Sequence, residues 1–320
     1  MAETLEIERR SFGRDGLAIP RIALGCGNFG GVGSAVAFFG QGLGEAQARE
    51  LMDAAWAMGI THFDTADAYG GGRSEQMVGA WMRSRGVRPM LTTKTYNPMS
   101  AGADQGLRPE RIVRQLDASL ARLGVDHADL YLAHEYDEAV PLLQTSRAFD
   151  QLKAAGKLRA YGVSNFDAAQ LEQALVTGEP VAVQNAHSLL ERDDDRAVLP
   201  LCAERQLAYL AFSPLSGGWL TGKYRRGEPY PDGSRMTQRP EPYQALVADQ
   251  TFDALERLQG FATEREMSIA GVALAWLLAD DRVAQIVVGP GRPEHLEPVR
   301  EALRRPFDDD ERAQLEGRFS

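Results

Sequence analysis

Apolar positions along the chain alternate between two spacings, and this alternation predicts the fold. Short apolar runs of strand length are followed by stretches in which apolar residues recur every three or four positions. The clearest helical stretch is 108–124, where Leu116, Leu120 and Leu123 share one face. Asp15-Gly16, between two short extended runs at 9–22, predicts a hairpin before the alternation begins.

Eight strand–helix units follow this hairpin. Strands are expected at 21–25, 61–65, 89–94, 128–134, 159–165, 181–185, 207–213 and 284–289. Helices are expected at 45–59, 74–86, 108–124, 144–156, 167–178, 194–206, within 246–279, and at 293–303. Such alternation is typical of a parallel sheet with helical crossovers. Because no linker is evident, the pattern predicts one (β/α)8 barrel domain over residues 1–320, with a long Gly/Pro/Arg-rich loop, 214–243, after the seventh strand.

Composition and charge narrow the function classes. The 320 residues carry a formal net charge of -10 and a pI of about 5.1, which disfavours a nucleic-acid partner. The N-terminal MAETLEIERR has no apolar signal core, and no apolar run approaches the length of a membrane span. Two cysteines do not form a disulfide framework. We expect a cytoplasmic protein without a membrane segment; the sequence leaves its oligomeric state open.

Polar residues at successive strand ends indicate a reaction centre. Asp64 ends the second strand, with Tyr69 in the loop after it, while Lys94 ends the third and His134 the fourth. In such barrels, the C-terminal strand ends form one rim, where catalytic residues lie. Any one of these residues fits a rim position that merely faces water. Four together favour a site that transfers a proton to a carbonyl oxygen.

Each of the four has a place in that chemistry. A free tyrosine is a weak acid at neutral pH, and an adjacent ammonium group lowers the pKa of a phenol. Lys94 is therefore expected to lower the pKa of Tyr69, and Asp64 to hold Lys94 in its charged form. His134 is expected to position the carbonyl through a hydrogen bond.

Five segments resemble the signature segments of the aldo-keto reductases. They are FDTADAYGGGRSE (63–75), TTK (92–94), LYLAH (130–134), GVSNF (162–166) and FSPLSGGWLTGKYRRGEP (212–229). The similarity runs in order from about Arg9 to Leu303. The resemblance implies a (β/α)8 barrel that uses NADPH, less often NADH, to reduce aldehydes and ketones. It also implies that Asp64, Tyr69, Lys94 and His134 form the catalytic tetrad.

The same resemblance assigns candidate cofactor residues around the rim. These are Ser164, Asn165 and Gln184 for the carboxamide, Phe212 for the nicotinamide ring, Ser213, Leu215, Gly217 and Lys223 for the pyrophosphate, Gly289 and Arg292 for the adenosine end, and Gly27 and Asn28 in the loop after the first strand. The adenosine segment departs from the family pattern at Pro298-Val299. NADPH is therefore the expected cofactor, with NADH left open.

Other departures concern the substrate, expected to be a small carbonyl compound. Glu135 and Tyr136 follow His134 where the family often has tryptophan. Phe29, Phe38 and Phe39 give the first loop an apolar lip, which suits bulky or aromatic carbonyl compounds.

Two motif-like features are set aside. GCGNFG, 25–30, has dinucleotide-fingerprint spacing, but a long loop separates it from the next helix. His62 lacks the partners of a metal site and is expected in the core, so no metal is predicted.

Two alternatives stay open. The same residues would serve NADP-dependent oxidation of a sugar or an alcohol. Some relatives act as cofactor-sensing subunits with slow turnover, although the complete tetrad favours an enzyme.

Overall fold

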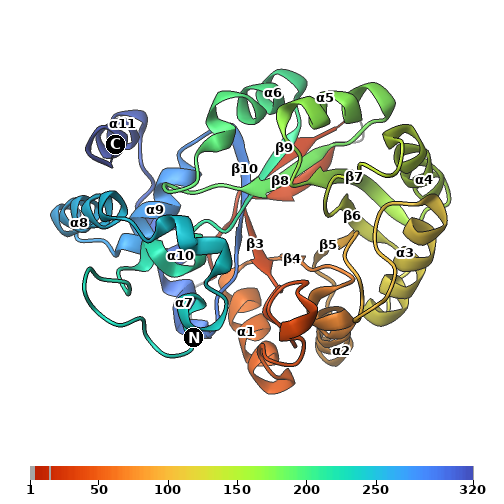
Figure 1. The fold of residues 1–320 in the computed structure, drawn as a ribbon, viewed down its shortest axis with the longest axis horizontal. Helices are drawn as coiled ribbons and strands as arrows, with labels where there is room; N and C mark the ends of the chain where they lie inside the picture. Colours follow the sequence, from red (N-terminus) through yellow and green to blue (C-terminus); the bar gives the residue numbers. More distant parts are fainter. Residues whose placement is uncertain (1–3, 14–15, 320) are drawn as a thin grey trace.

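The computed structural model describes residues 4–13 and 16–319, which form a closed barrel inside a ring of helices (Figure 1). The barrel strands follow the order β10-β3-β4-β5-β6-β7-β8-β9, and all neighbouring pairs are parallel. They are β3 (Ile22–Gly25), β4 (His62–Asp64), β5 (Met90–Thr95), β6 (Ala128–Ala133), β7 (Leu158–Ser164), β8 (Ala182–Ala186), β9 (Ala208–Phe212) and β10 (Val283–Val288). The predicted (β/α)8 barrel is confirmed.

Helices cover the outside of the barrel. They are α1 (Glu45–Met58), α2 (Arg73–Arg85), α3 (Pro109–Leu123), α4 (Leu142–Ala154), α5 (Ala168–Thr177), α6 (Val198–Arg205), α7 (Arg235–Gln238), α8 (Asp249–Glu264), α9 (Ile269–Leu278), α10 (Glu297–Arg304) and α11 (Asp309–Phe319). On α3 the predicted apolar face is buried, as Leu116, Leu120 and Leu123 pack into the core between helices and strands.

The N-terminal hairpin closes the end of the barrel at which the strands begin. Strands β1 (Arg9–Phe12) and β2 (Leu17–Pro20) pair antiparallel, as predicted, while Asp15 of the expected turn lies outside the described residues. Ile19 belongs to the same buried cluster as Met90 and Leu130, near the starts of β5 and β6. The hairpin leaves the opposite rim uncovered. That rim is formed by the C-terminal ends of the strands, where the candidate catalytic residues are expected.

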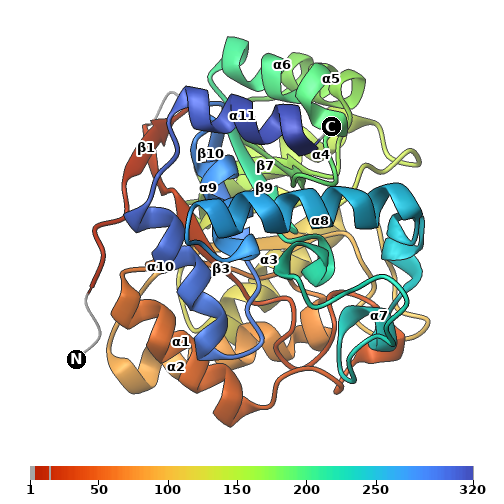
Figure 2. The same ribbon diagram turned by 90° about the vertical axis from the view of Figure 1, so that its left-hand side faces the viewer.

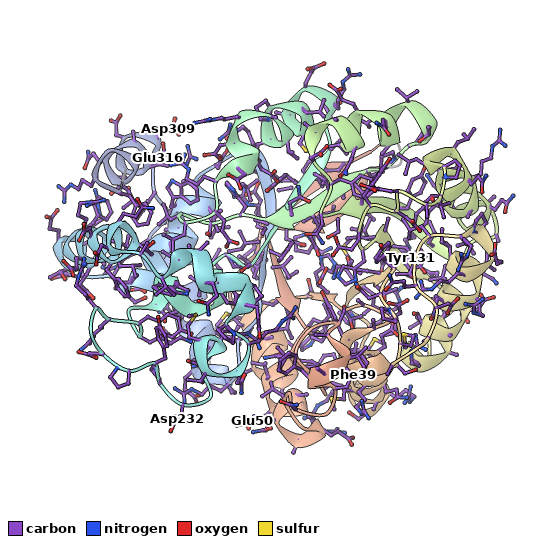
Figure 3. The ribbon with its side chains drawn as sticks, in the orientation of Figure 1. Phe39, Glu50, Tyr131, Asp232, Asp309 and Glu316 are labelled. Carbon is purple, nitrogen blue, oxygen red and sulfur yellow. The ribbon has the colours of Figure 1, made fainter. Side chains whose placement is uncertain are left out.

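Two helical predictions need correction. The helix expected at 194–206 begins only at Val198, because Asp194 lies in a separate 3₁₀ turn, η3 (Asp193–Arg196), and accepts hydrogen bonds from Asn185 and Tyr209. Helix α11 was not expected at all. It lies along α8 (Figure 2), and in Figure 3 its residues Asp309 and Glu316 mark the edge of the molecule.

The long segment after β9 contains short helical turns: η4 (Ser216–Thr221), α7 and η5 (Glu241–Leu246). It joins β9 to α8 and contributes buried apolar side chains, among them Trp219 and Leu220. In the described part of the chain, no helix combines the length and the apolar character needed to cross a bilayer.

Candidate active site

Four polar side chains meet at the C-terminal rim. Asp64 ends β4, Lys94 lies near the end of β5, and His134 directly follows β6. Tyr69 opens a 3₁₀ turn, η2 (Tyr69–Gly72), in the loop after β4. Lys94 Nζ donates to Asp64 Oδ1 over 2.5 Å and to the Tyr69 hydroxyl over 3.3 Å. The rings of Tyr69 and His134 meet edge to face, with centroids 5.5 Å apart.

Lys94 is held in its charged form inside the protein. Burial of its fully enclosed side chain would lower the pKa of Lys94, but Asp64 and Tyr69 outweigh that effect, so the pKa lies above its ordinary value. The ammonium group also donates to Thr65 O over 2.9 Å. The second oxygen of Asp64 accepts a 2.8 Å hydrogen bond from Gln184 Nε2, so both carboxylate oxygens are engaged.

The net direction of the Tyr69 pKa shift differs from the expectation. Burial raises the pKa of Tyr69, and the nearby Lys94 ammonium opposes this without reversing it. The sequence identified the charged neighbour but not the loss of solvent around the phenol. Burial and the Lys94 charge together lower the pKa of His134 well below its ordinary value. At neutral pH the site therefore combines a protonated phenol with an uncharged imidazole.

Glycines let the loop that carries Tyr69 pack tightly against the loop after β3. Gly70 has φ +59°, and a Cβ there would lie 2.7 Å from Gly30 O. A side chain would therefore meet both backbone strain and a close carbonyl. Ser74, in the first turn of α2, is fully buried: its hydroxyl donates to Cys26 O over 3.0 Å and lies 2.8 Å from Thr65 Oγ1.

A buried polar network holds the loop after β4, which carries Tyr69, through its residue Asp67. Thr95 Oγ1 donates to Asp67 Oδ2 over 2.7 Å and accepts a 2.8 Å hydrogen bond from Arg111. Asp67 Oδ1 has no hydrogen-bond partner among the described residues. Burial, assisted by the neighbouring Glu75, raises the pKa of Asp67 to about 7. The loop thus rests on a carboxyl group that titrates near neutrality.

The candidate carboxamide residues lie beside the tetrad. Ser164 ends β7 and is buried, and Asn165 follows it with φ +59°. Asn165 Nδ2 donates to His134 O over 2.9 Å and to Glu135 Oε1 over 3.1 Å. Gln184, on β8, is the residue that donates to Asp64. These side chains connect the tetrad to the next two strands around the barrel.

Several residues of the glycine-rich segment after β9 have left-handed backbone conformations. Phe212 ends the strand, and Ser213, Ser216 and Gly217 have φ values of +55°, +44° and +63°. Such conformations can turn backbone amides toward an anion. Lys223 lies alongside, since a Cβ on Gly218 would be 2.3 Å from its Nζ. The segment, which also includes Leu215, is therefore one that could hold a pyrophosphate group.

The remaining candidates lie where β10 meets β3. A Cβ on Gly27 would lie 3.6 Å from the Tyr69 ring, and Asn28 Nδ2 donates to Pro290 O over 2.9 Å. Gly289 directly follows β10. Arg292 is mostly exposed, and its Nε donates to His295 Nε2 over 2.9 Å. The adenosine candidates thus lie at the protein surface.

Only part of the loop after β3 is exposed enough to form the expected apolar lip of the site. Phe29 is fully buried in the core, which corrects its expected exposure at the site. Phe38 and Phe39 are less enclosed: Arg239 lies over the Phe38 ring at 5.9 Å, and the Phe39 ring packs against Gly71. Phe39 is labelled in Figure 3. His62 is a core residue as expected, with its ring nitrogens bonded to Thr92 and Gln285.

Sequence reasoning missed two neighbours of the site. Tyr243, in η5, covers the glycine-rich segment, since a Cβ on Gly217 would lie 2.4 Å from its ring. No local pattern signals this contact, because the two residues are joined only by the folded loop. Glu135 was noted as a departure from the family, but its hydrogen bond from Asn165 required the fold.

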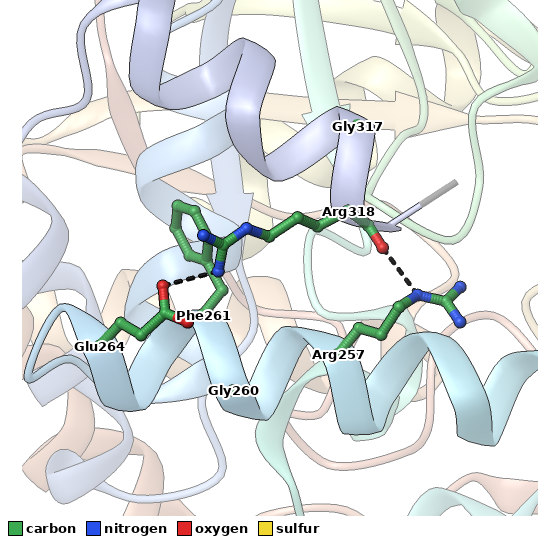
Figure 4. Close-up of a pocket in the computed structure, with 6 residues that line it drawn as sticks. All are labelled: Arg257, Gly260, Phe261, Glu264, Gly317 and Arg318. Atoms are coloured by element: carbon green, nitrogen blue, oxygen red, sulfur yellow. Dashed lines mark hydrogen bonds and ion pairs between the residues drawn. The ribbon is translucent and has the colours of Figure 1, made fainter.

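A separate groove of about 480 Å³ lies between α8 and α11 (Figure 4). Arg257 Nε donates to Arg318 O over 2.7 Å, and Arg318 bonds Glu264 over 2.6 Å. Phe261 and Gly317 complete much of its lining. None of the tetrad or candidate cofactor residues lines it.

Comparison with known proteins identifies the family. The model of the aldo/keto reductase family matches residues 21–318. L-glyceraldehyde 3-phosphate reductase of Escherichia coli O157:H7 is 30% identical, covering 97% of this chain and 92% of the relative. A Schizosaccharomyces pombe protein, named as a candidate voltage-gated potassium channel subunit beta, is 31% identical over 90% of this chain and 85% of its own length.

A solved structure agrees with the sequence relatives. Aldo-keto reductase AKR11C1 from Bacillus halodurans, in its holo form, matches with a TM-score of 0.79 and 25% identity, covering 98% of this chain and 96% of that one. The family generally binds NADP(H) and carries out NADP-dependent carbonyl reduction. The chain belongs to the aldo/keto reductase family and is an NAD(P)-dependent oxidoreductase.

Proposed function

We propose that this protein reduces an aldehyde or ketone to an alcohol with NADPH, and that Tyr69 supplies the proton. The observation that carries the proposal is the position of Lys94, fully buried between the Asp64 carboxylate and the Tyr69 hydroxyl. A buried ammonium group beside a phenol stabilises the phenolate that remains after proton transfer. A purely structural ion pair would not need the phenol.

Each member of the tetrad has one role in this proposal. The substrate oxygen lies between Tyr69 and His134, whose neutral imidazole donates a hydrogen bond that orients it. Bound NADPH supplies the hydride to the carbonyl carbon. Tyr69 gives its proton to the oxygen, and Lys94 stabilises the phenolate until solvent restores the proton. Asp64 keeps Lys94 charged and in place.

The cofactor would lie along the other half of the rim. The proposed contacts are Ser164, Asn165 and Gln184 at the carboxamide, Phe212 on the nicotinamide ring, Ser213, Leu215, Gly217 and Lys223 at the pyrophosphate, Gly27 and Asn28 beside Tyr69, and Gly289 and Arg292 at the adenosine end. We favour NADPH over NADH because Arg292 offers a guanidinium to a 2′-phosphate. We also propose that residues 1–320 form one domain and act in the cytoplasm, where their two buried, free cysteines stay reduced.

The test is NADPH oxidation with a panel of aldehydes and ketones, run beside Tyr69→Phe. Loss of a positioned general acid is expected to lower kcat by a factor of about 10²–10⁴ while NADPH still binds, as measured by cofactor fluorescence. Tyr131→Phe is the matched control, since it removes a buried hydroxyl that bonds Ile112 O outside the tetrad. Equal turnover by Tyr69→Phe and the wild type would refute the role of Tyr69.

The two alternatives give different results in the same assay. Faster turnover of NADP with sugars or alcohols than of NADPH with carbonyls would indicate the oxidative direction. A cofactor-sensing subunit is the second candidate because a channel-subunit relative is among the similar proteins. Tight NADPH binding with negligible turnover of every carbonyl compound would support it.

A further inference from the structure

Glu135 is a carboxylate on the loop after β6, next in the chain to His134. Its side chain is half-buried, and Asn165 Nδ2 donates to Glu135 Oε1 and to His134 O. This shared donor, which follows β7, ties Glu135 to the end of β6. The Glu135 carboxylate therefore lies beside the backbone carbonyl of His134, the residue proposed to hold the substrate oxygen.

No positive charge balances this carboxylate. In the described part of the chain, Glu135 forms no ion pair and its hydrogen bond comes from a neutral amide. The charged residues that follow it on the same loop, Asp137 and Glu138, are also acids. All three act on Tyr96 across the rim, where burial and their negative charges raise the pKa of that phenol. The charged residues of this loop from Glu135 to Glu138 are therefore all acidic.

We propose that Glu135 determines specificity, by making the site discriminate against carbonyl compounds that carry a nearby anionic group and favour neutral or cationic ones. The inference rests on the proposed reductase function, whose substrate class it narrows. Like charges brought together at a partly desolvated site are a common means of rejecting a wrong partner. The protein would then differ from its Escherichia coli relative, which is named for a phosphorylated aldehyde.

The discrimination should depend on pH. Burial raises the pKa of Glu135 to about 7. The groups that face it are the Asn165 amide after β7, the uncharged His134 after β6, the neutral Tyr96 after β5, and the acids Asp137 and Glu138 of its own loop. Because its negative charge develops between about pH 6 and 8, rejection of anions should strengthen over that range.

The experiment compares two aldehydes of matched shape, 4-formylbenzoate and 4-formylbenzamide. The benzoate is charged throughout this pH range, so its own titration does not contribute. The ratio of their kcat/KM values cancels steps common to both. At pH 8 we expect the wild type to prefer the amide roughly tenfold, and Glu135→Gln to lose this preference and its pH dependence. Glu135→Lys should reverse the preference.

Glu138→Gln is the matched control, because it removes the same charge from an exposed position on the same loop. It should leave the ratio unchanged. An unchanged ratio in Glu135→Gln, or an equal change in Glu138→Gln, would overturn the proposal. So would reduced turnover of both aldehydes at a constant ratio, since Glu135 would then act only through Asn165. Failure of the wild type to reduce even the neutral amide or any other aldehyde would instead refute the reductase function, and this inference with it.

Discussion

The ion pair between Asp64 and Lys94 offers the most direct test of the site. Both side chains are enclosed, at 4% and 0% exposed, and their atoms lie 2.5 Å apart. Asp64→Asn keeps the shape but removes the charge, and leaves Lys94 with uncharged acceptors only: the Thr65 carbonyl, the Tyr69 hydroxyl and the new amide oxygen. Removing one partner of a buried pair typically costs about 3–5 kcal/mol, because the other charge stays uncompensated. We expect the free energy of unfolding at pH 7 to fall by that amount.

The sign of the pH dependence follows from the pKa of Lys94. In the wild type this pKa is raised, so the pair contributes fully below the pKa of an unfolded lysine and is lost only as pH rises through the folded value. In Asp64→Asn, only Tyr69 opposes the effect of burial, and we expect the pKa of Lys94 to fall below the unfolded value. The unfolded variant then binds more protons than the folded one, and its stability rises with pH. The deficit of the variant should therefore shrink between pH 7 and 10.

The assay is urea unfolding followed by circular dichroism at several pH values. Asp117→Asn is the matched control: Lys157 Nζ also lies 2.5 Å from its carboxylate, but both side chains are well exposed, so the loss should be at most about 1 kcal/mol. Adding Lys94→Met to Asp64→Asn should restore part of the stability by removing the unpaired charge. A loss at pH 7 no larger than that of the control, or a deficit that grows with pH, would refute the reasoning.

Three further predictions follow from the loops and the buried network. Gly70→Ala should lower Tm, because backbone strain and steric crowding together cost about 1–3 kcal/mol. The loss should exceed that of Gly86→Ala, where φ is also positive but no atom lies within 4 Å of the added Cβ. Equal losses in the two variants would show that crowding at Gly70 contributes nothing. Ionisation of Asp67 destabilises the folded state, because burial raises the pKa of Asp67 to about 7. The free energy of unfolding of Asp67→Asn should therefore rise relative to that of the wild type by about 2–4 kcal/mol between pH 5 and 8. An equal difference between the two proteins at both pH values, measured by urea unfolding, would contradict this. Gly217→Ala should weaken NADPH binding, measured by fluorescence titration, because the added Cβ would push the Tyr243 ring out of its place over the glycine-rich segment. An unchanged affinity for NADPH would show that Gly217 and Tyr243 do not form part of the cofactor site.

The barrel and the meeting of the tetrad could be predicted because both depend on where strands end. Apolar runs and their bounding residues are local features, and parallel strands bring their C-termini to one rim. The solvent exposure of a side chain depends on residues that are distant in the sequence. The predicted lowering of the Tyr69 pKa was therefore wrong in its net direction: the sequence identifies Lys94 as a neighbour but does not say how much water the phenol loses on folding.

Some missed features did carry local signals. Before α11, Asp308 and Glu311 bond each other's backbone amides, over 2.8 and 3.1 Å, in the reciprocal pattern of a capping box. The D-x-x-E spacing was visible in the sequence and could have predicted this helix. The late start of α6 had no such signal, because Asp194 is drawn from the helix by Asn185 and Tyr209, and Tyr209 belongs to the following strand.

The strand order also explains why the proton-transfer half of the site is more sharply defined than the cofactor half. Asp64, Lys94 and His134 come from consecutive strands, β4 to β6, whereas the cofactor candidates span β7 to β10 and return to β3. The two halves are joined at Gln184, which donates to Asp64, and at Asn165, which donates to His134 O and Glu135. A change at either amide should therefore affect cofactor binding and proton transfer together. Kinetic effects confined to one of them would mean that the amides serve a single half, and that the halves act independently.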